Sequence, residues 1–348
     1  MQAGIQFFSA IEGEQSESEY FADCLDLVEL VDRLGFDHVR TVEHYFRPYG
    51  GLTPNPIVFL AAAAQRSKQI RLITGAVLPV FNHPLKLAGE IGMLDAISGG
   101  RAEIGFARAF LPHEFLRFGR SMDESRARFD EGLDAVTQLL ESEGVAFAGK
   151  FHEWPETTSL PRPTQRSRPP FWIAAASARE TFINAGTLGH GIMVIPGGTE
   201  ALVANIAEYR EAFRSAGHEG NPRVMVAVHM VCNTDAKVAR ATAEEAIEKY
   251  LSRMVAASSE WQDTLSKDYP GYDKMITAMA DETFESQLES GGAWVGTPDE
   301  VYEQARSFNE LAGPFDTASM QVNPGGLDVN IAKTSVELFA AHVLPRLQ

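Results

Sequence analysis

The segment VRTVEHYFRPYG, residues 39–50, passes from an apolar run directly into residues that can do acid–base chemistry. His44 can exchange a proton near neutral pH, and Glu43 beside it could influence the tautomer or charge of the imidazole. Tyr45 and Phe46 follow as aromatic groups that could line a substrate pocket. The alternative interpretation of His44 is a hydrogen-bonded surface histidine.

Two further polar groups stand at the ends of apolar runs. Arg108 ends RAEIGFAR, where a guanidinium suits a phosphate or carboxylate, with a salt bridge to one of the many acids as the alternative. Ser177 follows FWIAAA and opens SARETFINAG, where its hydroxyl and the amides of a helix N-terminus could hold a phosphate. A capping box is the other interpretation, because Glu180 stands three residues after Ser177.

His229 lies inside VMVAVHMVC, where alternation places its side chain either in a barrel interior or against a helix. A hydrogen-bonded core histidine is the simpler interpretation, and a place on the wall of a substrate pocket is the other. The nine histidines are scattered without metal-ligand spacing, so we expect no metal site.

Eight short β-rich runs recur along the chain, most of them almost continuously apolar, as is typical of parallel strands covered on both faces. Amphipathic stretches separate them; one stops at Gly35 and another begins near Pro56. The alternation predicts an α/β fold, a single (β/α)8 TIM-type barrel over residues 1–348. Active sites of this fold lie at the C-terminal ends of the strands, so residues 43–47 would line the mouth. The expected strands are residues 3–9, 38–43, 70–76, 102–107, 171–176, 191–195, 223–231 and 316–322.

Two segments interrupt the alternation. Residues 143–170 form a connection rich in Pro and Arg before the fifth strand. Residues 256–292 form a long insertion with weak helical patterning, and a segment of that length inside a compact domain is usually functional or disordered.

The composition argues against several classes of protein. With 30 Lys and Arg against 47 Asp and Glu, the net charge of −17 argues against a nucleic-acid-binding surface. No apolar run reaches the roughly 18 residues needed to span a bilayer, and the N-terminus lacks the basic region of a signal peptide. Cys24 and Cys232 form no CxxC motif, which suggests a reducing compartment. We expect a cytoplasmic protein without nucleic-acid or membrane partners.

Several stretches together resemble the bacterial luciferase-like flavin monooxygenases, in particular the branch of the luciferase α-subunits. The stretch GFDHVRTVEHYF looks like the strand of that family that ends in Glu-His-aromatic. GAVLPVFNHPLKLAGEIGMLDAISGGRAEIGFAR follows its third strand, third helix and fourth strand. FGRSMDESRARFDEGLD, FWIAAASARETF and VGTPDEV complete the set, and the likeness runs from residue 3 to about residue 345.

The resemblance implies a barrel that binds one reduced FMN at the C-terminal ends of its strands. Arg108 and Ser177 would bind the phosphate together with the backbone amides from Ala178 to Thr181. His44 would be the catalytic histidine beside the flavin.

The resemblance also implies which residues lie under the flavin ring and which segment closes over it. Gly75 or Ala76 falls where the family often has a non-proline cis peptide under the isoalloxazine, and residues 256–292 correspond to its mobile lid. Ala107 and Ala176 stand where the luciferases have a reactive cysteine and an acid. Those two differences leave flavin binding plausible and put light emission in doubt.

The implied activity is that of a two-component monooxygenase. Reduced FMN and O2 would form a C4a-peroxide that transfers one oxygen atom to a small organic substrate, by hydroxylation, Baeyer–Villiger insertion or aldehyde oxidation. No G-x-G-x-x-G motif opens a nicotinamide site, so a separate flavin reductase would supply the reduced FMN. An F420-dependent hydride-transfer oxidoreductase and a non-catalytic flavin-binding protein are the alternatives. The resemblance also implies a homodimer.

Overall fold

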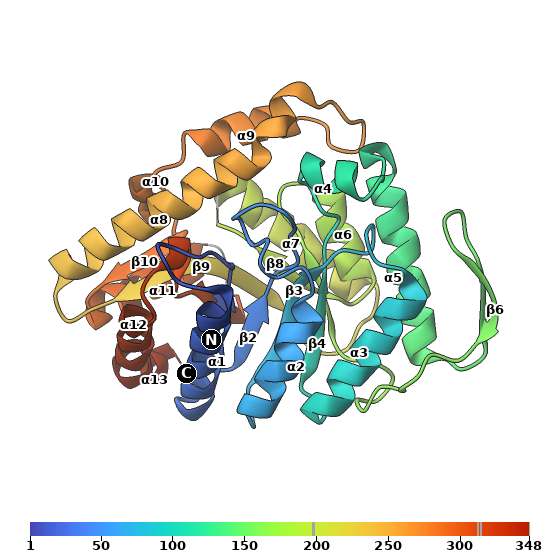
Figure 1. The fold of residues 1–348 in the computed structure, drawn as a ribbon, viewed down its shortest axis with the longest axis horizontal. Coiled ribbons are helices and arrows are strands. Elements are labelled where there is room, and N and C mark those ends of the chain that lie inside the picture. Colours follow the sequence, from blue (N-terminus) through green and yellow to red (C-terminus); the bar gives the residue numbers. More distant parts are fainter. Residues whose placement is uncertain (197–198, 312, 314, 348) are drawn as a thin grey trace.

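Eight parallel strands close into a barrel, and helices cover its outside (Figure 1). The computed structural model describes residues 1–196, 199–311, 313 and 315–347. Around the barrel the order is β1, β2, β3, β4, β7, β8, β9, β11, and β11 pairs back to β1. The predicted (β/α)8 barrel is confirmed. Its strands are β1 (Gln2–Phe7), β2 (His38–Thr41), β3 (Arg71–Val77), β4 (Ala102–Phe106), β7 (Phe171–Ala174), β8 (Gly191–Val194), β9 (Val224–Cys232) and β11 (Thr317–Gln321).

Helices form the outer layer and alternate with the strands along the chain. Within the described ranges, none is both long and apolar enough to cross a membrane. The helices of this layer are α1 (Glu17–Arg33), α2 (Pro56–Arg66), α3 (Pro84–Ser98), α5 (Ser125–Glu141), α6 (Arg179–Thr187), α7 (Thr199–Ser215), α8 (Ala236–Ser258), α11 (Pro298–Leu311), α12 (Val329–His342) and α13 (Leu344–Leu347). Three short helices lie in connections: α4 (Pro112–Arg117), η1 (Met122–Glu124) and η3 (Pro324–Gly326).

Helix boundaries follow local signals in the sequence. The side chain of Asn55 accepts a hydrogen bond from the amide of Ile57 (3.0 Å) at the start of α2, and Pro56 occupies the first turn. Helix α1 ends at Arg33, and Gly35 then turns the chain with a φ of +81°, which glycine adopts without steric cost. The predicted start and stop are both confirmed.

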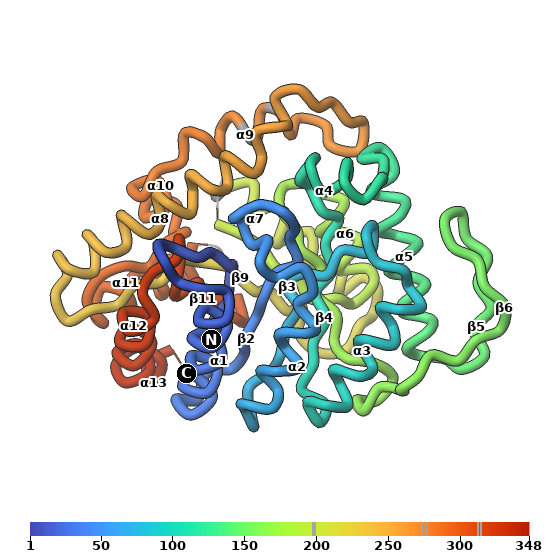
Figure 2. Tube along the Cα trace, viewed as in Figure 1, coloured from blue at the N-terminus to red at the C-terminus, as the bar shows by residue number. Residues whose placement is uncertain are grey.

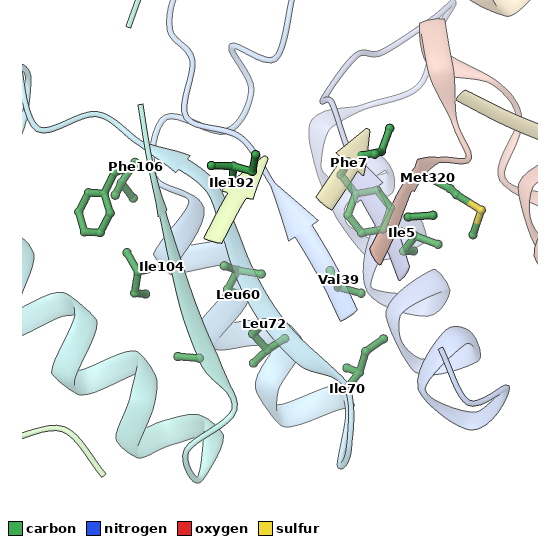
Figure 3. Packing of buried hydrophobic residues seen from close by; sticks show 14 of the residues in the cluster. Ile5, Phe7, Val39, Leu60, Ile70, Leu72, Ile104, Phe106, Ile192 and Met320 are labelled. Atoms are coloured by element: carbon green, nitrogen blue, oxygen red, sulfur yellow. The ribbon is translucent and has the colours of Figure 1, made fainter. Parts of the chain in front are cut away.

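The main hydrophobic core lies between the barrel and its helices (Figure 3). Ile5, Val39 and Leu72 stand at the same level of three neighbouring strands, and all three are fully buried. Leu60 of α2 belongs to the same core. Because a fully buried side chain of this size stabilises the fold by about 1.5–3 kcal/mol, this layer fixes the strands that carry the site.

Paired charges fill the end of the barrel where the strands begin. Glu103 accepts hydrogen bonds from Arg71 (2.6 Å), Arg223 (2.6 Å) and the indole of Trp172 (2.5 Å), and Arg71 also pairs with Asp37. Burial raises the pKa of Glu103, but the charges of Arg223 and Arg71 outweigh it and hold the pKa below its usual value. The carboxylate therefore stays charged at neutral pH, opposite two cations.

The structure adds strands that the sequence pattern missed. Strands β5 (Val145–Ala148) and β6 (Glu153–Thr157) form an antiparallel hairpin within residues 143–170, and the hairpin stands away from the barrel (Figure 2). Strand β10 (Ala293–Gly296) pairs with the end of β9. Strands β5 and β10 have only four residues each, and β6 has a single buried residue among polar and exposed ones, so none of the three gives a strong signal in the sequence.

Residues 256–292 cover the mouth of the barrel (Figure 1). Two buried residues of this segment attach it to the chain that follows β4. Trp261 Nε1 donates to the carbonyl of Phe110 (2.8 Å), and the hydroxyl of Tyr269 donates to the carbonyl of Ala109 (2.7 Å). The segment thus has the position of a lid, and its mobility stays a prediction. It contains the end of α8, then η2 (Ser259–Asp263), α9 (Tyr272–Ala280) and α10 (Phe284–Glu289).

Candidate active site

A cavity of about 1150 Å³ lies among the C-terminal ends of the strands and extends between α5 and α6. Residues that are far apart in the sequence share its wall, as expected where parallel strands end together. The predicted site residues that line it are Glu43, His44, Gly75, Ala76, Ala107, Arg108, Ser177, Ala178 and His229.

His44 packs among aromatic side chains, with ring centres 5.4 Å from Phe8 and 5.5 Å from Tyr49. Its Nδ1 is 3.1 Å from Oε1 of Glu114, a fully buried carboxyl that also accepts from the amide of Tyr45 (2.9 Å). With a hydrogen on Nδ1, the neutral ring presents Nε2 as the proton acceptor. Glu114 therefore orients the imidazole.

Glu43 is not the acid that bonds to His44, which corrects the expected pairing. Its carboxyl instead accepts hydrogen bonds from the hydroxyl of Tyr45, from Nδ2 of Asn82 (2.9 Å) and from the amide of Leu78 (3.0 Å). Burial raises the pKa of Glu43 to about 7, although these three donors lower it. Glu43 can therefore hold or release a proton near neutral pH on this wall.

Tyr45 and Phe46 lie outside the cavity, which corrects their predicted place on its wall. Phe46 is 54% exposed, and the rings of both residues pack on Phe118. The backbone of Phe46 takes a φ of +66°, so the chain turns here, three residues after the end of the strand expected over residues 38–43.

The peptide bond between Gly75 and Ala76 is cis, as predicted, and both residues line the cavity. A Cβ at Gly75 would lie 2.3 Å from Cδ of Arg40, so a side chain at this position would displace the arginine. Ala107 stands just beyond the end of β4 on the same wall. Gly75, Ala76 and Ala107 are small residues, and the wall that they form can accept a flat ring.

Arg108 reaches from β4 to the covering segment. Its Nη2 donates to the carbonyl of Asp268 (2.9 Å), its guanidinium carbon lies 4.4 Å from the ring centre of Tyr269, and its Nη1 is buried without a partner. The hydrogen bond goes to a carbonyl, which does not support the salt-bridge alternative. Arg126 of α5 lines the same cavity, and the carboxyl of Asp130 interacts electrostatically with both arginines. Two cations and an unpaired donor suit an anionic group.

Ser177 lies exposed between β7 and α6, at the edge of the same cavity. The alternative role as a helix cap is wrong, because α6 begins at Arg179, its N-cap is Ala178, and no side chain caps it. Of the amides expected to hold a phosphate, that of Thr181 donates to the carbonyl of Ala178 (2.9 Å) and is already used.

His229 lines the cavity and lies 4.8 Å, between ring centres, from Tyr250 of α8. Burial lowers the pKa of His229 to about 4, so the ring is neutral at pH 7. Its Nδ1 has no partner. The pocket interpretation fits this placement better than that of a hydrogen-bonded core histidine.

The sequence reasoning missed several residues of this wall. Arg126 lies within the motif FGRSMDESRARFDEGLD and could have been found there as a second cation, whereas Glu114 lies 70 positions from His44 without a local signal. Arg40 is hidden inside an apolar strand. Among the described residues, no group of three or more His, Cys, Asp or Glu could hold a metal ion.

This barrel, with its cavity at the strand ends, has the architecture of the luciferase-like oxygenases. The chain belongs to the luciferase-like monooxygenase family, whose model matches residues 1–313, so the resemblance read from the motifs is confirmed.

Three similar proteins illustrate the relationship. The crystal structure of the monooxygenase RslO1 from Streptomyces bottropensis is 40% identical, with a TM-score of 0.89 and 100% of both chains covered. The oxygenase component of the flavin-dependent trigonelline monooxygenase from Acinetobacter baylyi is 27% identical over 96% of this chain and 92% of its own. The oxygenating constituent of 3,6-diketocamphane monooxygenase from Pseudomonas putida, solved with FMN, shares the fold at 23% identity, with a TM-score of 0.83 and coverage of 99% and 98%.

Proposed function

We propose that this protein is the oxygenase component of a two-component, FMN-dependent monooxygenase. The observation that carries the proposal is a single cavity lined by His44, by the cis peptide at Gly75 and by Arg108 with its unpaired Nη1. When bound, reduced FMN would react with O2 and deliver one oxygen atom to a small organic substrate. The related diketocamphane enzyme, which binds FMN, supports this choice of cofactor.

The residues present fit this cofactor. A phosphate is an anion with several acceptor oxygens, and Arg108, Arg126 and Ser177 offer donors on one part of the wall. The flat isoalloxazine needs a surface of small side chains, which Gly75 and Ala76 supply. A cavity of about 1150 Å³ is large enough to hold an organic substrate as well.

The roles of the residues follow from their contacts. His44 would accept or return a proton through Nε2, because Glu114 occupies Nδ1. Glu43, with its pKa of about 7, would act as a proton donor or acceptor on the same wall. Trp261 and Tyr269 would keep water out of the mouth, since both belong to the covering segment and are buried where it contacts the chain after β4.

Oxygen transfer can be tested with labelled gas. Protein supplied with FMN, NADH, a flavin reductase and 18O2 would be offered a panel of aldehydes, cyclic ketones and phenols. The wild type should give a product carrying one 18O atom with at least one compound. His44→Ala should bind FMN equally well and release hydrogen peroxide instead, and an unchanged product yield in this variant would contradict the role of His44.

The two alternatives give different results in the same preparation. A hydride-transfer enzyme would bind F420 more tightly than FMN in a spectral titration. A non-catalytic binding protein would bind FMN and consume no more oxygen with any acceptor than without one.

Two partners belong to the proposal. The trigonelline relative is named as the oxygenase component of its enzyme, which supports a separate flavin reductase here. A homodimer is expected from the family resemblance, and sedimentation velocity of the purified chain would test it.

A further inference from the structure

Arg40 is a buried cation on the floor of the cavity. It is 7% exposed, and its guanidinium donates to Oε1 of Gln6 and, at 3.3 Å, to Sδ of Met193. Its Nε is buried without a partner. Burial lowers the pKa of Arg40 to about 10, which still leaves the group charged at neutral pH.

No carboxylate in the described part of the chain forms an ion pair with Arg40, whose hydrogen-bond partners are a neutral amide and a thioether. Taking a charge out of water without an opposite charge is costly, and such groups are usually paired. An arginine kept in this state indicates that its partner arrives with a ligand.

Two neighbouring strands place further unpaired groups on the same wall. Gln321 of β11 is 1% exposed with Nε2 unpartnered, and His229 of β9 is 7% exposed with Nδ1 unpartnered. Strands β9, β11, β1 and β2 are consecutive around the barrel, so these groups and Arg40 occupy one half of it. All of them can bond to an acceptor oxygen.

We propose that Arg40 recognises an anionic oxygen of the substrate, such as a phenolate, an enolate or a carboxylate. The inference rests on the proposed function, since it assigns the phosphate end of the flavin to the other half of the barrel and leaves Arg40 beside Gly75, where the flat ring would lie. Arg108 follows β4 and Ser177 follows β7, and both strands lie opposite β11 and β1 in the barrel order. His44, which follows β2, stands on the substrate side, so an oxygen held by Arg40 would fix the substrate near the imidazole.

Two coloured probes of similar shape test the charge preference without flavin. 4-Nitrophenol ionises near neutral pH and 4-nitroaniline stays neutral, and both can be titrated into flavin-free protein by absorbance. In the wild type, the bound nitrophenol should show the phenolate spectrum at a pH where the free probe is mostly protonated. A bound probe with the neutral spectrum would overturn the proposal.

The matched variants are Arg40→Met, Arg40→Lys and, on the exposed face of α11, Arg306→Met as a control. Arg40→Met should bind nitrophenolate about 10- to 100-fold more weakly, the usual effect of losing a hydrogen bond to a charged group. Arg40→Lys should retain part of the preference, and nitroaniline affinity should change in none of them. Equal nitrophenolate affinity in the wild type and Arg40→Met would overturn the proposal.

The remaining outcomes separate this inference from the proposed function. Arg40→Met should melt at or above the wild-type temperature and bind FMN equally well. A variant that fails to fold would make Arg40 a structural residue, and a loss of FMN affinity alone would assign it to the flavin; either contradicts the proposal. If the wild type binds no FMN while nitrophenolate binding still depends on Arg40, the anion site stands and the flavin assignment fails.

Discussion

Arginines at the two ends of the barrel have opposite surroundings: Arg71 and Arg223 are partly exposed and paired, whereas Arg40 is buried and has no acidic partner among the described residues. Where the strands begin, Arg71 and Arg223 both pair with Glu103 at 2.6 Å. On the floor of the cavity, the hydrogen-bond partners of Arg40 within the described residues are Gln6 and Met193. The two regions therefore differ in charge balance and in burial, since the cation without an acid is also the more buried one.

The contrast between paired and unpaired arginines distinguishes groups that stabilise the fold from groups that can bind a ligand. Breaking a buried pair leaves an uncompensated charge and lowers stability, whereas removing a charge that has no partner relieves a cost. Unpaired atoms on the cavity wall, at Arg40, Arg108, His229 and Gln321, are therefore better indicators of function than the paired network below.

The largest effect is expected at the paired end. Glu103→Leu should lower the free energy of unfolding by about 3–5 kcal/mol, because it leaves Arg71 and Arg223 without their shared acid. Urea denaturation at neutral pH would measure it, with Glu103→Gln as the smaller change that keeps the shape. A Glu103→Leu variant as stable as the wild type would remove the basis of the comparison.

The second effect concerns the pH dependence of stability and comes from Glu43. Its pKa of about 7 lies above the value in the unfolded chain, so the folded state binds an extra proton between about pH 4.5 and 7. The contribution of Glu43 to the free energy of unfolding is thus fully present at low pH, and it falls by about 3 kcal/mol as the pH rises through that range. In Glu43→Gln the unfolding free energy should vary less between about pH 5 and 8; an identical profile would contradict the raised pKa.

The smallest expected effect is on stability, and it compares one arginine from each region, Arg71 and Arg40. Arg71→Met should lower the free energy of unfolding by about 2 kcal/mol, because Asp37 and Glu103 lose a partner. The partial exposure of Arg71 keeps this loss small. In Arg40→Met the free energy of unfolding should stay unchanged or rise. Equal losses in the two variants, compared by urea unfolding, would show that Arg40 is as structural as Arg71.

Much of the fold could be predicted because its signals are local. The apolar runs marked all eight barrel strands, and His44 and Arg108 stand directly after two of them. The role of Glu114 could not be predicted in this way, because its contact with His44 joins residues 70 positions apart. Arg40 was missed for another reason: within HVRTVE it is one polar residue in a buried strand, and only the closed barrel reveals that no carboxylate among the described residues pairs with it.

The central claim is that the cavity binds reduced FMN through its phosphate at Arg108. Anaerobic titration with reduced FMN and with reduced riboflavin, which lacks the phosphate, tests it directly in the wild type and in Arg108→Met. The wild type should bind FMN about 100-fold more tightly than riboflavin, and Arg108→Met should lose most of that difference. Equal affinity of the wild type for the two flavins would contradict the claim.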